Sequence, residues 1–284
     1  MTGASGFIGS NIMDSLEQRG HTVYGCCHTK IVEKDNFITC DLSKHMPDLQ
    51  VDVVVHAAAV SPSGHATFND YFTNNVIVSK NVLEYAKIHH VKRIIYIGAV
   101  SSYGKINGVL REDSPHNDPE DYGLTKYMAE KMVRNSKIPY YILILPGVVG
   151  KGCKDIWIMK AAKAIYSNKA LNYYNGQGIF NNILEIGDLC QFIVKLLDKE
   201  QCESDTYLLG SREKMLTDDV IKYLRDKLSS DSQLCERRKD NKASFYLDVQ
   251  KALAAGFCSK PMKRILDEVC AEVLAEGELK NKWR

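Results

Sequence analysis

The segment Thr2-Gly3-Ala4-Ser5-Gly6-Phe7-Ile8-Gly9 is the most informative part of this chain for its architecture. Its glycines follow the spacing G-x-x-G-x-x-G, and apolar residues then recur at Ile8, Ile12 and Leu16, which predicts a helix directly after the turn. Glycines at this spacing permit a tight turn, close approach of a pyrophosphate and close packing of helix on strand. The helix N-terminus offers free N–H groups to phosphates. Alone, the spacing also fits an ordinary glycine-rich turn, so the order of the following segments decides.

The composition is that of a globular chain. Of 284 residues, 45% are hydrophobic and 25% charged, and the formal net charge is +2. Such balance gives no reason to expect a nucleic-acid or anionic-membrane partner. The longest apolar run, residues 140–150, is broken by Pro146 and Gly147 and is shorter than the roughly 20 residues that span a bilayer. Without a secretory pattern, and with nine cysteines but no C-x-x-C pair, we expect a cytoplasmic protein with reduced thiols and no metal site.

Strand and helix patterns alternate along the first half of the chain. Strands are expected at 21–27, 37–40, 51–56, 92–97 and 140–145, and helices at 68–90 and, with Asp118 as N-cap, at 118–136. This alternation predicts an α/β fold with a doubly wound, Rossmann-like parallel sheet. We expect residues 1–150 to form a dinucleotide-binding domain to which 184–212 return. Residues 151–284 would form mainly a smaller α/β lobe that binds the substrate.

The first strand of the expected sheet is short. Only Met1 and Thr2 precede the glycine turn, although the first strand of a doubly wound sheet is central. Loss of about five residues there would leave both neighbouring strands short of hydrogen bonds. Two explanations stay open: the true start lies upstream, or the strand is a stub.

The end of the second expected strand bears on the choice of dinucleotide. Folds of this type often place an acid there to bind the adenosine ribose hydroxyls. Here Cys27, His28, Thr29 and Lys30 include no carboxylate. This neutral-to-basic stretch favours NADP, with NAD possible, and places His28 among the candidate cofactor contacts. The alternative is that His28 and Lys30 are only solvated.

Tyr122 and Lys126 are the candidate catalytic pair, because residues four apart share a helix face. The free phenol has a pKa of about 10, and lowering it by about three units requires roughly 4 kcal/mol. A neighbouring ammonium and a cofactor charge favour the phenolate. Such a tyrosine can pass a proton to or from a sugar or alcohol oxygen as hydride moves on the adjacent carbon. Two further pairs with this spacing, Tyr127/Lys131 and Tyr223/Lys227, are interpreted as solvated helix faces.

Motifs along nearly the whole chain resemble the extended short-chain dehydrogenase/reductases, in their NAD-dependent epimerase/dehydratase group. The matching segments are residues 2–9, 41–42, 56–59, 74–76, 103–104, 122–126, 182–189, 207–210 and 248–257. Together they are specific for the group, of nucleotide-sugar type, but not for a substrate.

The resemblance implies a role for each matching residue. Tyr122 would donate or accept the proton, and Lys126 would bind the nicotinamide ribose and lower the pKa of the tyrosine. The other cofactor contacts would be Gly3, Ser5, Gly6, Phe7, Ile8 and Gly9 around the pyrophosphate, Asp41 and Leu42 at the adenine side, and Ala57, Ala58, Ala59, Asn75 and Pro146 along the cleft.

The chain departs from the group at the position of its catalytic Ser/Thr, which is Ala99 here and cannot hydrogen-bond. Ser101, two residues on, would face a similar way if the segment stays extended, and is the candidate replacement; the alternative is a turn serine. Val100 and Ser101 also stand where dehydratases of the group carry an Asp-Glu pair, so dehydration is not expected. Residues 144–149 lack the Arg and Asn that often contact the substrate.

These observations predict an NAD(P)-dependent nucleotide-sugar epimerase or keto-reductase in which hydride moves between nicotinamide and a sugar carbon. One alternative is a reductase of a non-nucleotide ketone. Another, favoured by Ala99, is a non-catalytic NAD(P)-binding sensor or scaffold. Members of the group often dimerise through the two helices expected at 68–90 and 118–136, so a homodimer is expected.

Overall fold

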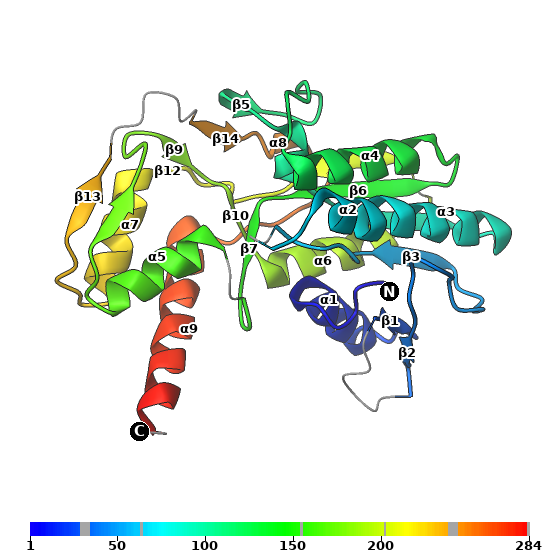
Figure 1. Cartoon of the computed structure of the whole chain (residues 1–284), viewed down its shortest axis with the longest axis horizontal. Coiled ribbons are helices and arrows are strands. Elements are labelled where there is room, and N and C mark those ends of the chain that lie inside the picture. The colour runs from blue at the N-terminus through cyan, green and yellow to red at the C-terminus, as the bar shows by residue number, and fades with distance from the viewer. Residues whose placement is uncertain (29–34, 63–64, 154–155, 202, 238–243, 283–284) are drawn as a thin grey trace. The chain divides into compact units, whose positions relative to one another are not determined.

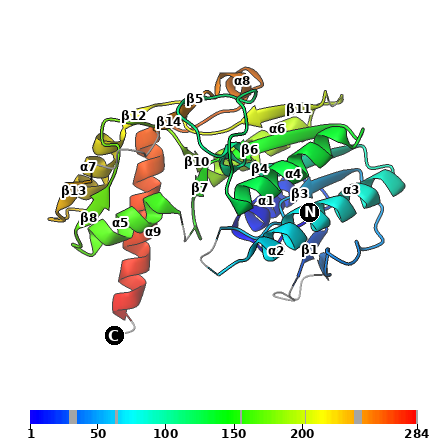
Figure 2. The same ribbon diagram turned by 45° about the horizontal axis from the view of Figure 1, so that its top comes forward.

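The structure is a computed structural model that describes residues 1–28, 35–62, 65–153, 156–201, 203–237 and 244–282, with side chains as far as residue 277. Thr29 and Lys30 therefore lie outside the described residues. The chain divides into two compact units. The first unit contains Met1–Lys105, Glu112–Leu145 and Leu189–Leu208, and the second contains Ile106–Arg111, Pro146–Asp188 and Leu209–Arg284. Figures 1 and 2 show the elements of each.

The first unit is built on a parallel sheet. Its strands are β1 (Gly25–Cys27), β2 (Phe37–Thr39), β3 (Val53–His56), β4 (Arg93–Ala99), β6 (Tyr140–Leu145) and β11 (Asp205–Leu208). β1 pairs with β2, β3 with β4, β4 with β6, and β6 with β11, and all these pairs are parallel. The buried strands carry almost unbroken apolar runs, as strands covered on both faces require. The α/β fold predicted from the sequence is confirmed.

Thr2 holds the position of the central strand. It forms parallel bridges to Cys26 on one side and to His56 on the other, and thereby joins β1 to β3. The Thr2 amide donates to Val55 O (3.0 Å), and the Cys26 amide donates to Met1 O (2.8 Å). The order across the sheet is therefore β2, β1, Thr2, β3, β4, β6 and β11. All strands are parallel, but the order in which the chain adds them reverses at Thr2, where the glycine turn begins.

Helices cover both faces of this sheet. They are α1 (Phe7–Gln18), α2 (Phe68–Tyr71), η1 (Phe72–Ile77), α3 (Val78–Ile88), η2 (Val100–Tyr103) and α4 (Asp121–Asn135), together with most of α6 (Ile186–Leu197). In Figure 1, α3 and α4 lie on one side of the strands and α1 on the other. The apolar core beneath α3 includes Val54, Val82 and Ile94.

Two predicted helices differ from those observed. The long helix expected at 68–90 contains a π-helical segment, η1, which places the buried Asn75 and Val76 within a wider turn. Asp118 is not an N-cap: α4 begins at Asp121 and its N-cap is Glu120. Asp118 has a positive φ of 48°, and its carboxylate pairs with Lys105 instead. The short polar side chain of an aspartate tolerates this left-handed backbone. The salt bridge to Lys105 compensates the charge of its carboxylate.

Among its described residues, the second unit contains short paired strands and four helices. The strands are β5 (Gly108–Leu110), β7 (Gly147–Val149), β8 (Leu171–Tyr173), β9 (Ile179–Phe180), β10 (Ile183–Glu185), β12 (Met215–Leu216), β13 (Leu234–Glu236) and β14 (Phe245–Leu247). The helices are α5 (Trp157–Tyr166), α7 (Thr217–Lys227), α8 (Gln250–Ala254) and α9 (Met262–Lys282). β8 pairs in parallel with β13, which lies far from it in the sequence. Each strand depends on a distant partner, which local pattern does not reveal.

Arg93 gives a stability prediction for the first unit. This side chain is only 8% exposed, and its guanidinium donates to Leu196 O (2.8 Å) and Lys199 O (2.7 Å) at the end of α6. Arg93→Met is expected to lower the free energy of unfolding by about 2 kcal/mol, because buried carbonyls lose charged donors. Urea denaturation measures this loss. The neighbouring control Lys92→Met, which removes an exposed pair with Asp52, should cost under about 0.5 kcal/mol; equal losses would contradict the assignment.

Candidate active site

The glycine turn is packed so closely that Gly3 and Gly9 have no room for a side chain. Gly3 has a positive φ of 66°, and a Cβ there would lie 2.7 Å from Ala58 N. A Cβ on Gly9 would lie 2.0 Å from Gly3 O. Gly6 is the N-cap of α1, whose first turn has neither a side-chain cap nor an acidic residue. The first N–H groups of α1 are thus left to an external anion, so this turn fits the diphosphate of a dinucleotide.

A hydrogen-bonded chain fixes the turn to the next strand and helix. The Thr2 hydroxyl accepts from Ala58 N (3.2 Å) and lies 2.7 Å from His56 Nδ1. His56 Nε2 lies 2.9 Å from Ser79 Oγ, which donates to Asn75 O (2.5 Å). These directions assign the proton of the imidazole to Nε2, with Nδ1 as acceptor. Burial lowers the pKa of His56 to about 3, so this ring is neutral and structural.

Tyr122 lies in the first turn of α4 and borders a cavity of about 680 Å³ in the first unit. The cavity is lined by Pro62, Tyr71, Ser101, Glu120, Asp121, Tyr122 and Gly123. Tyr71 meets the phenol edge-on, with ring centroids 5.8 Å apart. Gly123 is required at its position, because a Cβ there would lie 2.1 Å from Ser101 O. The first turn of α4 therefore lies directly against Ser101.

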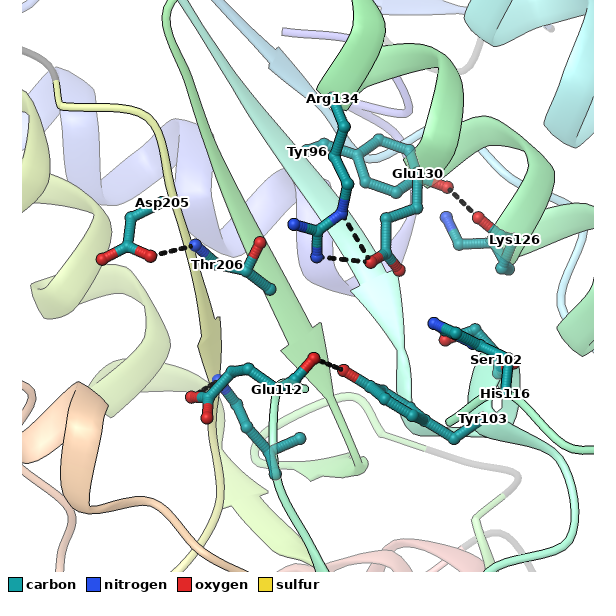
Figure 3. A network of polar contacts seen from close by, with 11 residues as sticks. Tyr96, Ser102, Tyr103, Glu112, His116, Lys126, Glu130, Arg134, Asp205 and Thr206 are labelled. Carbon is teal, nitrogen blue, oxygen red and sulfur yellow. Dashed lines mark hydrogen bonds and ion pairs between the residues drawn. The ribbon is translucent and has the colours of Figure 1, made fainter. Parts of the chain in front are cut away.

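Lys126 lies one turn behind Tyr122 and is only 4% exposed. Its Nζ donates to Ile97 O (2.6 Å) and lies 4.4 Å from the ring centroid of Tyr96. Tyr96 Oη in turn donates to Lys126 O (3.3 Å), as Figure 3 shows. Burial lowers the pKa of Lys126 to about 7, and Glu130 opposes that shift. The ammonium is thus close to titration at neutral pH, as is common in catalytic sites.

The pKa of Tyr122 moves in the direction opposite to the one expected from the sequence. Burial, followed by the neighbouring Tyr71, raises it to about 12. The Lys126 ammonium, which would favour the phenolate, donates to Ile97 O, and burial lowers its own pKa. In this state the phenol is a proton donor, and a lower pKa would require further positive charge beside it.

Ser101 reaches the cavity by a route that the sequence argument did not foresee. The segment after β4 is not extended: residues Val100–Tyr103 form the 3-10 helix η2. The premise that Ser101 repeats the direction of Ala99 was therefore wrong, yet Ser101 is exposed and lines the cavity with Tyr122. The 3-10 turn brings its backbone against Gly123.

The structure also places the other predicted cofactor residues. Asn75 is buried. Its Oδ1 accepts from Val60 N (2.9 Å) and its Nδ2 donates to Thr125 Oγ1 (3.1 Å), so it connects the loop after β3 to α4.

Asp41 accepts hydrogen bonds from the amide and the hydroxyl of Ser43 and forms an ion pair with Lys44. The Ser43 hydroxyl is the main cause that lowers the pKa of Asp41 to about 2. Leu42 is buried in the core, whereas His28 and Ser5 are exposed. Phe7 and Ile8 are partly buried in the first turn of α1. Ala57, Ala58 and Ala59 directly follow β3, and Pro146 directly follows β6.

The two other Tyr/Lys pairs make contacts within the protein and are more than solvated helix faces. Tyr127 stacks on His116, with ring centroids 3.6 Å apart. Tyr223 Oη and Lys227 Nζ both bind Asp267 at 2.8 Å, which joins α7 to α9. Neither pair lines the Tyr122 cavity.

Sequence reasoning missed three residues at the site, which are Tyr71, Tyr96 and Glu130. The aromatic side chains Tyr71 and Tyr96 carry no motif that would have singled them out. Glu130 could have been found, because it repeats the four-residue interval from Tyr122 to Lys126. Within the described ranges, no group of three or more His, Cys, Asp or Glu residues could hold a metal ion. None of the helices searched in the described residues is both long and apolar enough to span a bilayer.

Comparisons with known proteins agree with this geometry. The model of the NAD dependent epimerase/dehydratase family matches residues 1–210. YtcB of Bacillus subtilis, described as an uncharacterized UDP-glucose epimerase, is 25% identical over 256 residues, which are 80% of each chain. A UDP-glucose 4-epimerase of Vibrio cholerae is 22% identical over 242 residues, 79% of this chain and 74% of that protein.

Solved structures share the fold. The UDP-glucuronic acid 4-epimerase of Bacillus cereus in complex with NAD superposes with a TM-score of 0.81 at 24% identity, covering 96% of this chain and 97% of that one. MoeE5 in complex with UDP-glucuronic acid and NAD gives a TM-score of 0.81 at 19% identity, covering 98% of both chains. With the glycine turn, the Tyr122/Lys126 pair and a family match over most of its length, this chain belongs to the NAD dependent epimerase/dehydratase family.

Proposed function

We propose that this protein is an NAD-dependent 4-epimerase of an uncharged UDP-hexose such as UDP-glucose. The observation that carries the proposal is the placement of Tyr122 at a cavity, with Lys126 buried one turn behind it on α4. The names of the relatives, UDP-glucose epimerases among them, support the substrate class. We assign dinucleotide binding to the first unit and much of the substrate binding to the second.

The side chains divide the chemistry between them. When bound, the nicotinamide ring would accept a hydride from the sugar carbon and return it to the opposite face. Tyr122 removes the proton from the hydroxyl on that carbon and later gives it back. Moving its pKa from about 12 to near 7 requires roughly 7 kcal/mol of stabilisation of the phenolate. Lys126 supplies part of that stabilisation as a buried cation. Ser101 offers the hydroxyl that Ala99 lacks.

The choice between NAD and NADP rests on different observations. The family description and the solved relatives support NAD, and we propose NAD as the resident cofactor. The absence of a carboxylate at Cys27 and His28 still favours NADP, which stays a prediction from the sequence. Mass spectrometry of the nucleotide that co-purifies decides between them.

A homodimer remains part of the proposal. α3 and α4 lie side by side, and a cavity of about 390 Å³ between them is lined in part by Leu83 and Met132. An apolar groove between these two helices suits packing against a second copy. Sedimentation velocity tests this point.

Sugar charge provides the test of the proposed activity. Glu120 and Asp121 line the cavity beside Tyr122. The carboxylate of a uronic acid lies two bonds from the reacting C4, so it would meet two like charges. A repulsion of about 1.4 kcal/mol corresponds to about a tenfold difference. We therefore expect NMR assays to show conversion of UDP-glucose to UDP-galactose with kcat/KM about tenfold above that for UDP-glucuronic acid.

Matched variants separate the possible outcomes. Asp121→Asn should reduce the ratio of kcat/KM for UDP-glucose to that for UDP-glucuronic acid. Glu84→Gln changes an exposed residue of α3 that does not line this cavity, and should leave the ratio unchanged. Equal rates for both sugars would refute the role of the two carboxylates. Bound dinucleotide without turnover of any UDP-sugar would favour the non-catalytic sensor that Ala99 suggests. Net reduction of a ketone with consumption of NADPH would favour the reductase.

A further inference from the structure

Charged side chains follow Tyr122 along one stripe of α4. Lys126, Glu130 and Arg134 succeed it at intervals of four residues, which places each beside the next along the helix surface. Glu130 is only 1% exposed, and Lys126 is 4% exposed. Figure 3 shows Glu130 with the Arg134 guanidinium beside its carboxylate and with Lys126 on the neighbouring turn. An acid and a base so deeply buried on adjacent turns influence each other strongly.

The Glu130 carboxylate is only partly satisfied. Arg134 donates to its Oε1 from both Nε (3.2 Å) and Nη2 (2.8 Å). Its Oε2 is buried and has no hydrogen-bond partner among the residues described. A buried charged oxygen without a donor is costly, and most structures avoid it. Apolar side chains in place of the whole Glu130/Arg134 pair would often cost no stability, so a purely structural role does not account for the acid.

The surroundings of Lys126 show what the charge of Glu130 does. The groups that act on the ammonium are Ile97 O and the Tyr96 ring on β4, Glu130 on α4 and the neutral His56 on β3. Burial lowers the pKa of Lys126, and Glu130 is the charged group that raises it. The pKa of Tyr96 lies well above its usual range, chiefly through burial, so this phenol carries no charge. Within the described residues Glu130 is thus the anion that favours a protonated Lys126.

We propose that Glu130 is a positioning residue that raises the fraction of Lys126 protonated at neutral pH, and thereby favours a cation one turn from Tyr122. Glu130 does not line the cavity and acts only through Lys126. Arg134 holds the carboxylate from the other side and leaves its second oxygen free to act on the lysine. This inference rests on the proposed function, because a cation is needed there only if Tyr122 exchanges a proton.

The isosteric variant Glu130→Gln tests the inference without requiring turnover. NMR of protein labelled with ¹³C at the lysine ε-carbons, with the Lys126 signal assigned from Lys126→Met, gives the titration midpoint directly. In the wild type this midpoint should lie near pH 7. Loss of the carboxylate should lower it by about one pH unit, the size expected for one nearby charge in a partly screened interior. The exposed control Glu84→Gln, which removes an ion pair with Lys80, should not move it.

The activity profile gives an independent readout. In Glu130→Gln, the fall of kcat towards alkaline pH should begin about one pH unit lower, with the rate largely retained on the acid side. A merely structural role would lower the rate at every pH alike. Glu130→Asp, which keeps the charge, should restore the wild-type midpoint.

Two results would overturn the inference: an unchanged Lys126 midpoint in Glu130→Gln, or an equal shift in the Glu84→Gln control. Should Glu130→Gln not fold, Arg134→Gln gives the reciprocal test. That variant removes a cation from the stripe, so the Lys126 midpoint should rise, and a fall would contradict the proposal. The NMR result stands whether or not UDP-sugars are substrates, so failure of the inference and failure of the proposed function are distinguishable.

Discussion

Tyr122→Phe should lower kcat for UDP-glucose by about 10²- to 10⁴-fold, the range that a general acid–base group contributes. The variant removes a single oxygen from the wall of the cavity and leaves the ring contact with Tyr71 in place. We therefore expect its melting temperature and its affinity for the dinucleotide to remain near those of the wild type. Steady-state kinetics, calorimetric binding and thermal unfolding measure the three quantities separately.

The helix that carries Tyr122 supplies its own control. Tyr127 also precedes a lysine by four residues, but it stacks on His116 and does not line the cavity. Tyr127→Phe should therefore leave kcat unchanged. If Tyr122→Phe turned over UDP-glucose at the wild-type rate, the proton transfer would have to be assigned elsewhere, with Ser101 and Tyr71 as the other residues with hydroxyls that line the cavity.

Sequence reasoning succeeded where chemistry leaves few options. The glycine turn could be placed because few other residues tolerate its backbone and its spacing. The choice of Tyr122/Lys126 as the catalytic pair, made from its place in the order of elements, stays a prediction. The apolar run at Tyr140–Leu145 predicted β6 to the residue, because a strand buried on both faces leaves no room for polar side chains.

The failures share a physical cause, which is dependence on distant partners. Asp118 looked like a helix cap, but its partner is Lys105, thirteen residues earlier. Nothing local indicates that η2 winds into a 3-10 helix, since that turn is stabilised where Gly123 admits the backbone of Ser101. The direction of the Tyr122 pKa was also wrong, because the spacing reveals the ammonium but not the burial that opposes it.

Gly9→Ala should lower the free energy of unfolding by about 3 kcal/mol, at the upper end of the usual cost of overpacking. The added methyl would lie 2.0 Å from Gly3 O and 2.7 Å from Gly3 C, so the backbone itself must move. A Cβ built on Gly3 would in turn lie within 3 Å of Ala57 and Ala58, so this side of the turn has no room in which to relax. Chemical denaturation of the purified variant measures the loss.

The same displacement should weaken the dinucleotide site. The amides at the start of α1 face an external anion only while Gly3 and Gly6 keep their positions, so we expect at least about tenfold weaker binding of NAD by calorimetry. Gly6→Ala is the matched control for stability, because its methyl would lie 3.3 Å from the same Gly3 O and needs a shift of only a few tenths of an ångström. It should cost about 1 kcal/mol or less. Equal losses in the two variants would show that the turn is pliable, and the close packing of Gly9 on Gly3 would then not be what shapes the anion site.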